Sequence, residues 1–324
     1  MGRLNSLLRL LADGRQHSGQ TLGESLGVSR AAVWKLVARL RDLGVDIQSG
    51  AGAGYHLPRP VILLNAEDIH RGLTGDARGR FDAVDVALTV GSTNQELLAI
   101  ADTVHRPRAL LAETQSAGRG RRGREWYSPF GASLYLSVLW PFEELGHGLS
   151  GLSLVAGLAV ADAIERTTGI AAGLKWPNDI VYQDRKLAGI LVELIGEPQG
   201  PCKVVIGIGI NCELPPTAGA AIDQPWVDLA SLGTSSPDRS ALAAAILNRC
   251  CEMLPEFADS GFAAFRERWG ERDSLKGREV RLLAGSQVHG GTVHGVDDGG
   301  ALLMDDSHGI VSWVSGEVSV RLST

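Results

Sequence analysis

The chain has 324 residues and a formal net charge of -6, with 44% hydrophobic and 21% charged residues. This length and composition predict a globular protein of about two domains and exclude a disordered, collagen-like or coiled-coil chain. Glycine is the unusual residue, because 41 are present without a fixed period. Such a surplus is typical of many tight turns, or of backbone that approaches a ligand closely.

The cysteines indicate a reducing compartment, and the hydropathy indicates a protein without a membrane helix. The cysteines are Cys202, Cys212, Cys250 and Cys251, and no Cys-x-x-Cys pair occurs. This pattern offers neither a disulfide framework nor the spacing of a zinc site, so we expect no metal bound by the protein alone. No apolar run reaches the ~20 residues that a membrane helix needs, and no signal core follows the N-terminus. We therefore expect a cytoplasmic protein without a membrane partner.

Charge is divided unevenly along the chain. Residues 1–65 carry eight Lys and Arg against four acids, a net +4, so the remainder carries -6 minus 4, or -10. This division indicates a small basic module joined to an acidic body, with chance clustering as the alternative.

Three short helices are predicted within the basic module. Leu4, Leu7, Leu8 and Leu11 repeat with helical spacing and predict a helix over 3–12, and Leu22 and Leu26 mark a second one. Gly27 supplies the turn that follows, because a residue without Cβ adopts positive φ readily. Ser29 is the expected N-cap of a third helix over 30–43.

Two short strands, 45–48 and 55–57, are expected next, joined by a glycine-rich wing. Together these elements predict a winged helix-turn-helix, whose third helix enters a DNA major groove. Its candidate DNA-binding residues are Ser29, Arg30, Trp34 and Lys35. The wing reads Gly52-Ala53-Gly54 and lacks a lysine, so one phosphate contact is expected to be missing. A packing module without DNA is the alternative, and Pro58 and Pro60 mark a linker.

A polar turn opens the acidic body. A strand over 84–90 is followed by Gly91-Ser92-Thr93-Asn94 and then by a helix over 95–102. Ser92 with Gln95, and Thr93 with Glu96, fit capping boxes. The same short polar side chains at a strand end also suit a small ligand, and both roles remain open.

An arginine-rich loop follows at 118–124. Its glycines match G-x-G-x-x-G, but Pro129 comes too early for the helix that a dinucleotide motif must open. Arg119, Arg121, Arg122 and Arg124 repel one another, so we expect a mobile loop that a polyanion such as a nucleotide triphosphate would order. A nucleic-acid patch or a protease-sensitive surface loop are the alternatives.

Three further segments carry candidate residues. After a strand over 132–140 and a helix over 150–166, Asn178 and Asp179 end the string Lys-Trp-Pro-Asn-Asp and could hold Mg²⁺ or a ribose, or form an Asx turn. Lys186 precedes an apolar strand and could reach a carboxylate or phosphate. The strand 204–211 contains Gly207 and Gly209, which leave room where a flat ligand could lie.

These strings occur together in one known family. Gly91-Ser-Thr-Asn94, Gln115 through Arg124, Lys175 through Asp179 and Arg185 through Glu193 resemble, in this order, the biotin–protein ligases. Because a winged helix-turn-helix precedes them, the chain resembles the bifunctional members that are also biotin operon repressors. The resemblance spans essentially the whole chain.

The resemblance implies an α+β multidomain fold. It would comprise a winged helix-turn-helix (1–65), an α/β ligase core on a mixed sheet (66–274) and an SH3-like β barrel (275–324). Short β-rich runs between 278 and 322, punctuated by glycine pairs, support the third part independently.

The resemblance also implies ligands and roles. ATP, Mg²⁺ arriving with it, and biotin would form biotinyl-5'-adenylate, whose biotin passes to a lysine of a biotin carboxyl carrier protein domain. The implied biotin-binding residues are Ser92, Thr93, Asn94, Gln115, Arg119, Gly120, Arg121 and Lys186, with Arg121 and Lys186 catalytic. The implied nucleotide-binding residues are Gly118, Arg121, Arg124, Trp126, Asn178, Asp179 and Asn211.

A homodimer formed when the adenylate is bound would recognise biotin operator DNA. Two alternatives remain open. One is a lipoate-type cofactor ligase, and the other is a ligand-sensing repressor without ligase activity.

Overall fold

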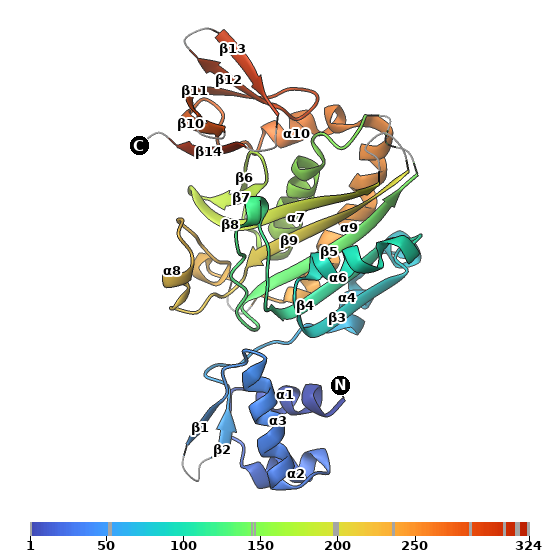
Figure 1. The fold of residues 1–324 in the computed structure, drawn as a ribbon, viewed down its shortest axis with the longest axis vertical. Coiled ribbons are helices and arrows are strands. Elements are labelled where there is room, and N and C mark those ends of the chain that lie inside the picture. The colour runs from blue at the N-terminus through green and yellow to red at the C-terminus, as the bar shows by residue number, and fades with distance from the viewer. Residues whose placement is uncertain are drawn as a thin grey trace.

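The computed structural model describes residues 2–50, 54–143, 145, 147–196, 201–234, 237–284, 287–306, 309–314 and 318–322. Three parts follow one another along the chain (Figure 1): a small helical unit, a large sheet covered by helices, and a smaller sheet near the C-terminus. This order agrees with an N-terminal helix-turn-helix domain, a core on a mixed sheet and a C-terminal β-sheet domain.

The N-terminal unit contains α1 (Gly2–Leu11), α2 (Gly19–Leu26) and α3 (Arg30–Asp42). Gly27 has φ 62°, and the Ser29 hydroxyl accepts the N–H of Ala32, so the predicted turn and N-cap are both present. The helices bury a leucine- and valine-rich core made of Leu4, Leu7, Leu8, Leu11, Leu22, Val33, Val37 and Leu40. The helix-turn-helix prediction is therefore confirmed.

The wing strands are β1 (Gln48–Gly50) and β2 (Gly54–His56), which pair antiparallel. The first strand begins three residues later than predicted, because Val45 and Ile47 are buried in the helical core. Gly52 and Ala53 lie outside the described residues, so the missing wing contact stays a prediction.

The segment between the N-terminal unit and the large sheet is tied to both. The N–H of Val61 donates to the Ala12 carbonyl at 2.8 Å, and the N–H of Leu64 donates to Glu113 Oε1 at 2.6 Å. Arg239 pairs with Glu113 at 2.8 Å and donates to the Ile62 carbonyl at 2.7 Å. Because both charged side chains are buried, this ion pair fixes the linker to the core.

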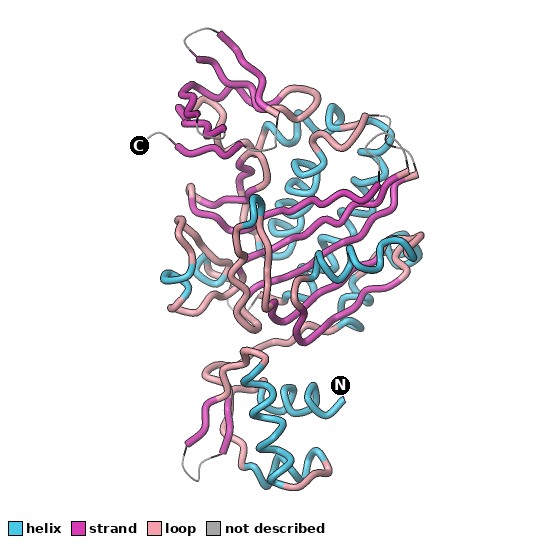
Figure 2. The backbone as a smooth tube through the Cα atoms, in the orientation of Figure 1, coloured by secondary structure: helices cyan, strands magenta, loops and turns pink. Residues whose placement is uncertain are grey.

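The large sheet has seven strands in the order β3-β4-β5-β9-β8-β7-β6, visible as a twisted layer in Figures 1 and 2. Among the described strands of this sheet only the β3–β4 pair is parallel, so the sheet is mixed as predicted. The strands are β3 (Ala83–Val90), β4 (Arg108–Gln115), β5 (Ser133–Phe142), β6 (Gly173–Lys175), β7 (Asp179–Tyr182), β8 (Arg185–Gly196) and β9 (Cys202–Asn211). The helices are α4 (Ala66–Gly72), α5 (Gly75–Arg80), α6 (Thr93–Ile100), α7 (Leu152–Thr168), α8 (Ala218–Ala221), α9 (Arg239–Ser260) and α10 (Arg266–Gly270).

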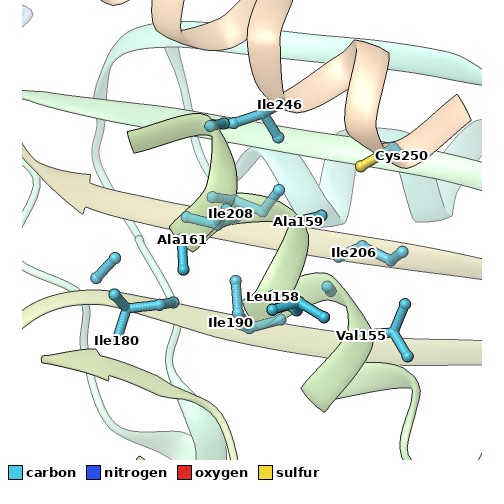
Figure 3. Close-up of a cluster of buried hydrophobic side chains, with 14 of the residues drawn as sticks. Val155, Leu158, Ala159, Ala161, Ile180, Ile190, Ile206, Ile208, Ile246 and Cys250 are labelled. Atoms are coloured by element: carbon cyan, nitrogen blue, oxygen red, sulfur yellow. The ribbon is translucent and has the colours of Figure 1, made fainter. Parts of the chain in front are cut away.

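Successive side chains of a strand point to opposite faces of the large sheet, and one of these faces is packed while the other is more open. Ile206 and Ile208 of β9 point into the core beneath α7 and α9 (Figure 3). Val205 points to the opposite face, where it packs with Leu97 of α6. Gly207 and Gly209 share the face of Val205, since side chains alternate along a strand. The α6 face therefore has little side-chain bulk at the middle of the sheet.

The C-terminal sheet has the order β13-β12-β11-β10-β14, with antiparallel neighbours. Its strands are β10 (Glu279–Ala284), β11 (Gln287–Val296), β12 (Leu302–Asp306), β13 (Gly309–Trp313) and β14 (Val318–Leu322), close to the runs predicted from the sequence. Among the described residues β13 and β14 do not pair with each other, so the sheet is open there. Trp176 donates its Nε1–H to the Gly300 carbonyl and attaches this sheet to the core.

All four cysteines are free and buried. Within the described ranges, every helix is too short or too polar to cross a bilayer.

Candidate active site

A cavity of about 340 Å³ opens on the α6 face of the large sheet. It brings together residues from six separate segments of the chain. The predicted site residues that line it are Ser92, Thr93, Asn94, Gln115, Arg119, Gly120, Arg121, Arg124, Trp126, Asn178, Asp179, Lys186 and Asn211.

One end of the cavity is a buried polar floor. Gln115 Oε1 accepts the N–H of Thr93 at 2.9 Å and lies 3.1 Å from its hydroxyl. Ser137, which the sequence analysis did not single out, donates its hydroxyl to Asn94 Oδ1 at 2.5 Å. Such a set of fixed donors and acceptors suits a small, neutral, polar group of a ligand.

The capping-box interpretation of Ser92 and Thr93 is wrong. Ser92 is the N-cap of α6, but its side chain makes no capping hydrogen bond. Thr93 directs its hydroxyl toward Gln115 instead. The ligand-facing role that the turn also allowed is the one compatible with this arrangement.

The open space predicted above Gly207 and Gly209 is filled by protein side chains. A Cβ at Gly207 would overlap the Asn94 amide, and one at Gly209 would lie 2.5 Å from the Trp126 ring. The glycines thus let Asn94 and Trp126 approach the backbone of the sheet closely. The Trp126 ring forms part of the cavity wall.

The other end of the cavity is cationic. Lys186 Nζ lies 2.7 Å from Asp179 Oδ1 and 5.4 Å from the centroid of the Trp126 ring. Arg121 donates to Asn178 Oδ1 at 3.0 Å. Burial lowers the pKa of the Arg121 guanidinium, although the nearby Asp179 carboxylate opposes this shift. Two partly buried cations on one wall favour an anionic ligand group such as a phosphate.

Asn211 supports this wall from behind. It is buried, and its Nδ2 donates to the carbonyls of Lys186 and Val227 at 3.2 and 3.1 Å. The amide therefore holds the backbone that carries Lys186.

The arginine-rich loop folds over the cavity. The N–H of Gly120 donates to the Arg124 carbonyl at 2.7 Å, and Trp126 N–H donates to the Gly118 carbonyl at 2.9 Å. Gly118 does not line the cavity. It packs against the Ser128 hydroxyl and the Trp126 carbonyl, each 2.6 Å from where a Cβ would lie, so its position explains why a glycine is required.

Two parts of the site besides Ser137 escaped sequence reasoning. Residues 221–224 and Trp226 close one side of the cavity, and the Pro225 carbonyl accepts the N–H of Lys186 at 2.9 Å. This irregular segment carries no motif that could have predicted it. Glu193 was part of a quoted string without a role, yet it lies 3.2 Å from Arg119.

Within the described ranges, no group of three His, Cys, Asp or Glu side chains could hold a metal ion. The Mg²⁺ expected with ATP therefore stays a prediction.

The candidate DNA-binding residues gather around the start of α3. Arg30, Trp34 and Lys35 are exposed. An exposure of 61% is high for a tryptophan, so Trp34 is open to a partner. Ser29 serves as the N-cap, so its hydroxyl already accepts a backbone N–H.

Comparisons with known proteins agree with this fold and site. The chain matches the models of the biotin/lipoate A/B protein ligase family over residues 88–211, an HTH domain over 3–56 and the biotin protein ligase C terminal domain over 276–321. It is 42% identical to the bifunctional ligase/repressor BirA of Escherichia coli over 97% of this chain and 96% of that protein. The corresponding protein of Bacillus subtilis is 29% identical over 94% and 93%.

A solved structure is also similar. The biotin protein ligase from Aquifex aeolicus in complex with biotin and ATP superimposes with a TM-score of 0.65 and 33% identity, covering 75% of this chain and all of that one. The fold and site thus define a protein ligase core preceded by a helix-turn-helix domain. The chain belongs to the family of bifunctional biotin protein ligases and repressors.

Proposed function

We propose that this protein activates biotin with ATP and then transfers it to a protein lysine. In the first step the biotin carboxylate attacks the α-phosphate, giving biotinyl-5'-adenylate and pyrophosphate. In the second step the amine of an acceptor lysine attacks the acyl carbon and releases AMP. Activation is needed because a free carboxylate is a poor acyl donor, and no nucleophile from this chain is required.

The observation that carries this proposal is the polarity of the cavity. Neutral amide and hydroxyl groups of Thr93, Asn94 and Gln115 line the part of the cavity at Gly207, where Asn94 lies. Lys186 lies at Gly189, which pairs with Gly209 two residues further along β9, and Arg121 also lines the cavity. Biotin has a neutral ureido group at one end and a carboxylate at the other, so it matches both ends. The cations would stabilise charge that develops between the carboxylate and the α-phosphate.

The proposal gives the cavity residues separate roles. Ser92, Thr93, Asn94 and Gln115 would bind biotin, while Arg119, Gly120 and Arg121 would cover it and the phosphates. Lys186 and Arg121 would be catalytic, and Trp126, Arg124, Asn178 and Asp179 would contact the nucleotide. Asn211, which lines the cavity, would complete the nucleotide side while its amide holds the Lys186 backbone. Gly118, which does not line it, would act on the nucleotide through the loop that it lets close.

The same proposal extends to partners and architecture. We infer an acceptor domain of a biotin carboxyl carrier protein, biotin operator DNA bound by α3, and a homodimer when the adenylate is bound. We also infer a cytoplasmic location, domain limits of 1–65, 66–274 and 275–324, and closure of the C-terminal sheet into an SH3-like barrel.

The direct test incubates the purified protein with Mg-ATP, an acceptor domain, and labelled biotin or labelled lipoate. Biotin-dependent pyrophosphate release and labelling of one acceptor lysine are expected, with no lipoyl transfer. Lipoyl transfer without biotinyl transfer would identify a lipoate-type ligase. Biotin binding without pyrophosphate release would identify a repressor without ligase activity.

A further inference from the structure

Glu193 lies where the polar floor of the cavity meets the arginine-rich loop. On β8, Gly189 and Leu191 line the cavity, and Glu193 follows on the same face because side chains alternate along a strand. Its side chain is 22% exposed. A carboxylate at this position is therefore close to the ligand site without lining it.

Both oxygens of the Glu193 carboxylate have a partner. Oε2 accepts a hydrogen bond from Asn94 Nδ2 at 2.8 Å, and Oε1 lies 3.2 Å from a guanidinium nitrogen of Arg119. Asn94 lies on the polar floor and Arg119 lies in the loop that covers the cavity. One side chain thus joins the two parts of the site.

The contact with Asn94 also determines which way its amide faces. A carboxylate only accepts hydrogen bonds, so the NH₂ group of Asn94 must face Glu193 and its oxygen must face the Ser137 hydroxyl. Gly207 makes room for this arrangement, since a Cβ there would overlap the amide. The Leu191 carbonyl also accepts from Asn94 Nδ2, but at 3.5 Å, so the contact with Glu193 is much the shorter of the two. Without a pure acceptor at position 193, the Asn94 amide could reverse and change the pattern of donors and acceptors on the floor.

We propose that Glu193 is a positioning residue for biotin binding, which orients the Asn94 amide and holds Arg119 over the bound ligand. This inference rests on the proposed function, because it requires biotin to be the ligand of the floor. Glutamate is suited to both tasks because it offers two acceptor oxygens. Glutamine offers one acceptor and one donor and can serve only one partner.

The test compares E193Q, E193D and a control, E165Q. Glu165 is another partly exposed carboxylate paired with an arginine, Arg272, but it lies outside the cavity. For E193Q we expect the Kd and KM for biotin to rise about tenfold to a hundredfold, as for loss of one hydrogen bond to a charged group. The KM for ATP should rise less than that for biotin, because the nucleotide would lose only the support of Arg119, whereas biotin would lose that of Arg119 and Asn94. E193D keeps two acceptors and should bind biotin better than E193Q, and E165Q should behave as the parent protein.

A second measurement separates positioning from folding. Trypsin cleavage at 119–124 should be slowed by biotin and ATP in the parent protein, and slowed less in E193Q, while the Tm stays unchanged. In an R119A background Asn94 is the remaining partner of residue 193, and a glutamine carbonyl can still accept from it, so E193Q should weaken biotin binding much less than in the parent and should no longer alter loop cleavage.

The outcomes distinguish the two proposals. If the parent protein does not bind biotin or release pyrophosphate with it, the proposed function fails. If the parent protein does both and E193Q has the same biotin Kd and the same loop protection, Glu193 is not a positioning residue. Should E193Q fail to fold, E193A replaces it, and a folded E193A protein with the parent's biotin Kd and loop protection would equally contradict the inference.

Discussion

Lys186 shows how one side chain obtains its role from neighbours distant in sequence. Its ammonium group lies 2.7 Å from Asp179 and above the Trp126 ring, while Asn211 and the Pro225 carbonyl fix its backbone. A lysine held in this way loses little freedom when an anionic ligand binds, because its chain is already ordered.

Lys186→Ala should slow adenylate formation by ~10²–10³-fold, the usual effect of removing one preorganised donor beside developing negative charge. Biotin-dependent pyrophosphate release in a single turnover measures this rate. Lys203→Ala is the matched control, because Lys203 Nζ donates to the Ala101 carbonyl outside the cavity. Adenylation at the parental rate in a folded K186A protein would show that Lys186 has no catalytic role.

At the scale of elements, the arginine-rich loop depends on few contacts. Three backbone hydrogen bonds close it, and Arg119 and Arg121 reach Glu193 and Asn178. Its four arginines still repel one another, and Arg122 adopts a left-handed conformation with φ 60°. Such a segment is expected to open more easily than the sheet beneath it.

Limited trypsin digestion should therefore cut the loop at 119–124 in the ligand-free protein, and biotin with ATP should protect it. An anionic ligand would neutralise the arginines and order the segment. Cleavage in the N-terminal unit serves as the internal reference, because its residues do not line the cavity. Equal loop cleavage with and without ligand would contradict this expectation.

At the scale of the whole molecule, the linker connects the N-terminal unit to the ligand site. The buried Glu113–Arg239 pair holds residues 62 and 64, and Glu113 is two residues from Gln115 on β4. The basic unit and the acidic core are therefore in continuous contact, so a change at one end has a physical path to the other.

Binding to the DNA of a biotin-gene promoter should tighten when biotin and ATP are present. A ligand that favours the dimer also favours whatever binds only the dimer. Affinity should fall steeply with salt, since phosphate contacts release counterions, and the absence of a wing lysine should make this slope shallower. The measurement is a titration at two salt concentrations with and without ligand.

Two results would contradict the expected coupling. Specific DNA binding with the same affinity in the presence and absence of biotin and ATP would show that the ligand site and the DNA site act independently. Absence of specific binding would show a ligase whose helix-turn-helix domain does not recognise this promoter. Arg30→Ala, which alters an exposed residue of α3, should weaken DNA binding without changing adenylation.

Much of this molecule could be predicted from local patterns. Leucine periodicity, Gly27 and the Ser29 cap determine the helix-turn-helix, because helices and turns depend on residues close in sequence. The β-rich runs near the C-terminus were likewise located within a few residues. The motif strings also identified most residues that line the cavity.

Only the tertiary structure decided how those residues are used. Thr93 fits a capping box in sequence but turns to Gln115, and Gly207 accommodates Asn94 instead of leaving a ligand space. The roles of Glu193, Ser137 and the segment 221–226 were invisible because their contacts join strands and loops far apart in the chain. Sequence determined which chemical groups are present and which elements carry them. Packing across the sheet determined which groups meet, since that depends on register and burial rather than on neighbours in sequence.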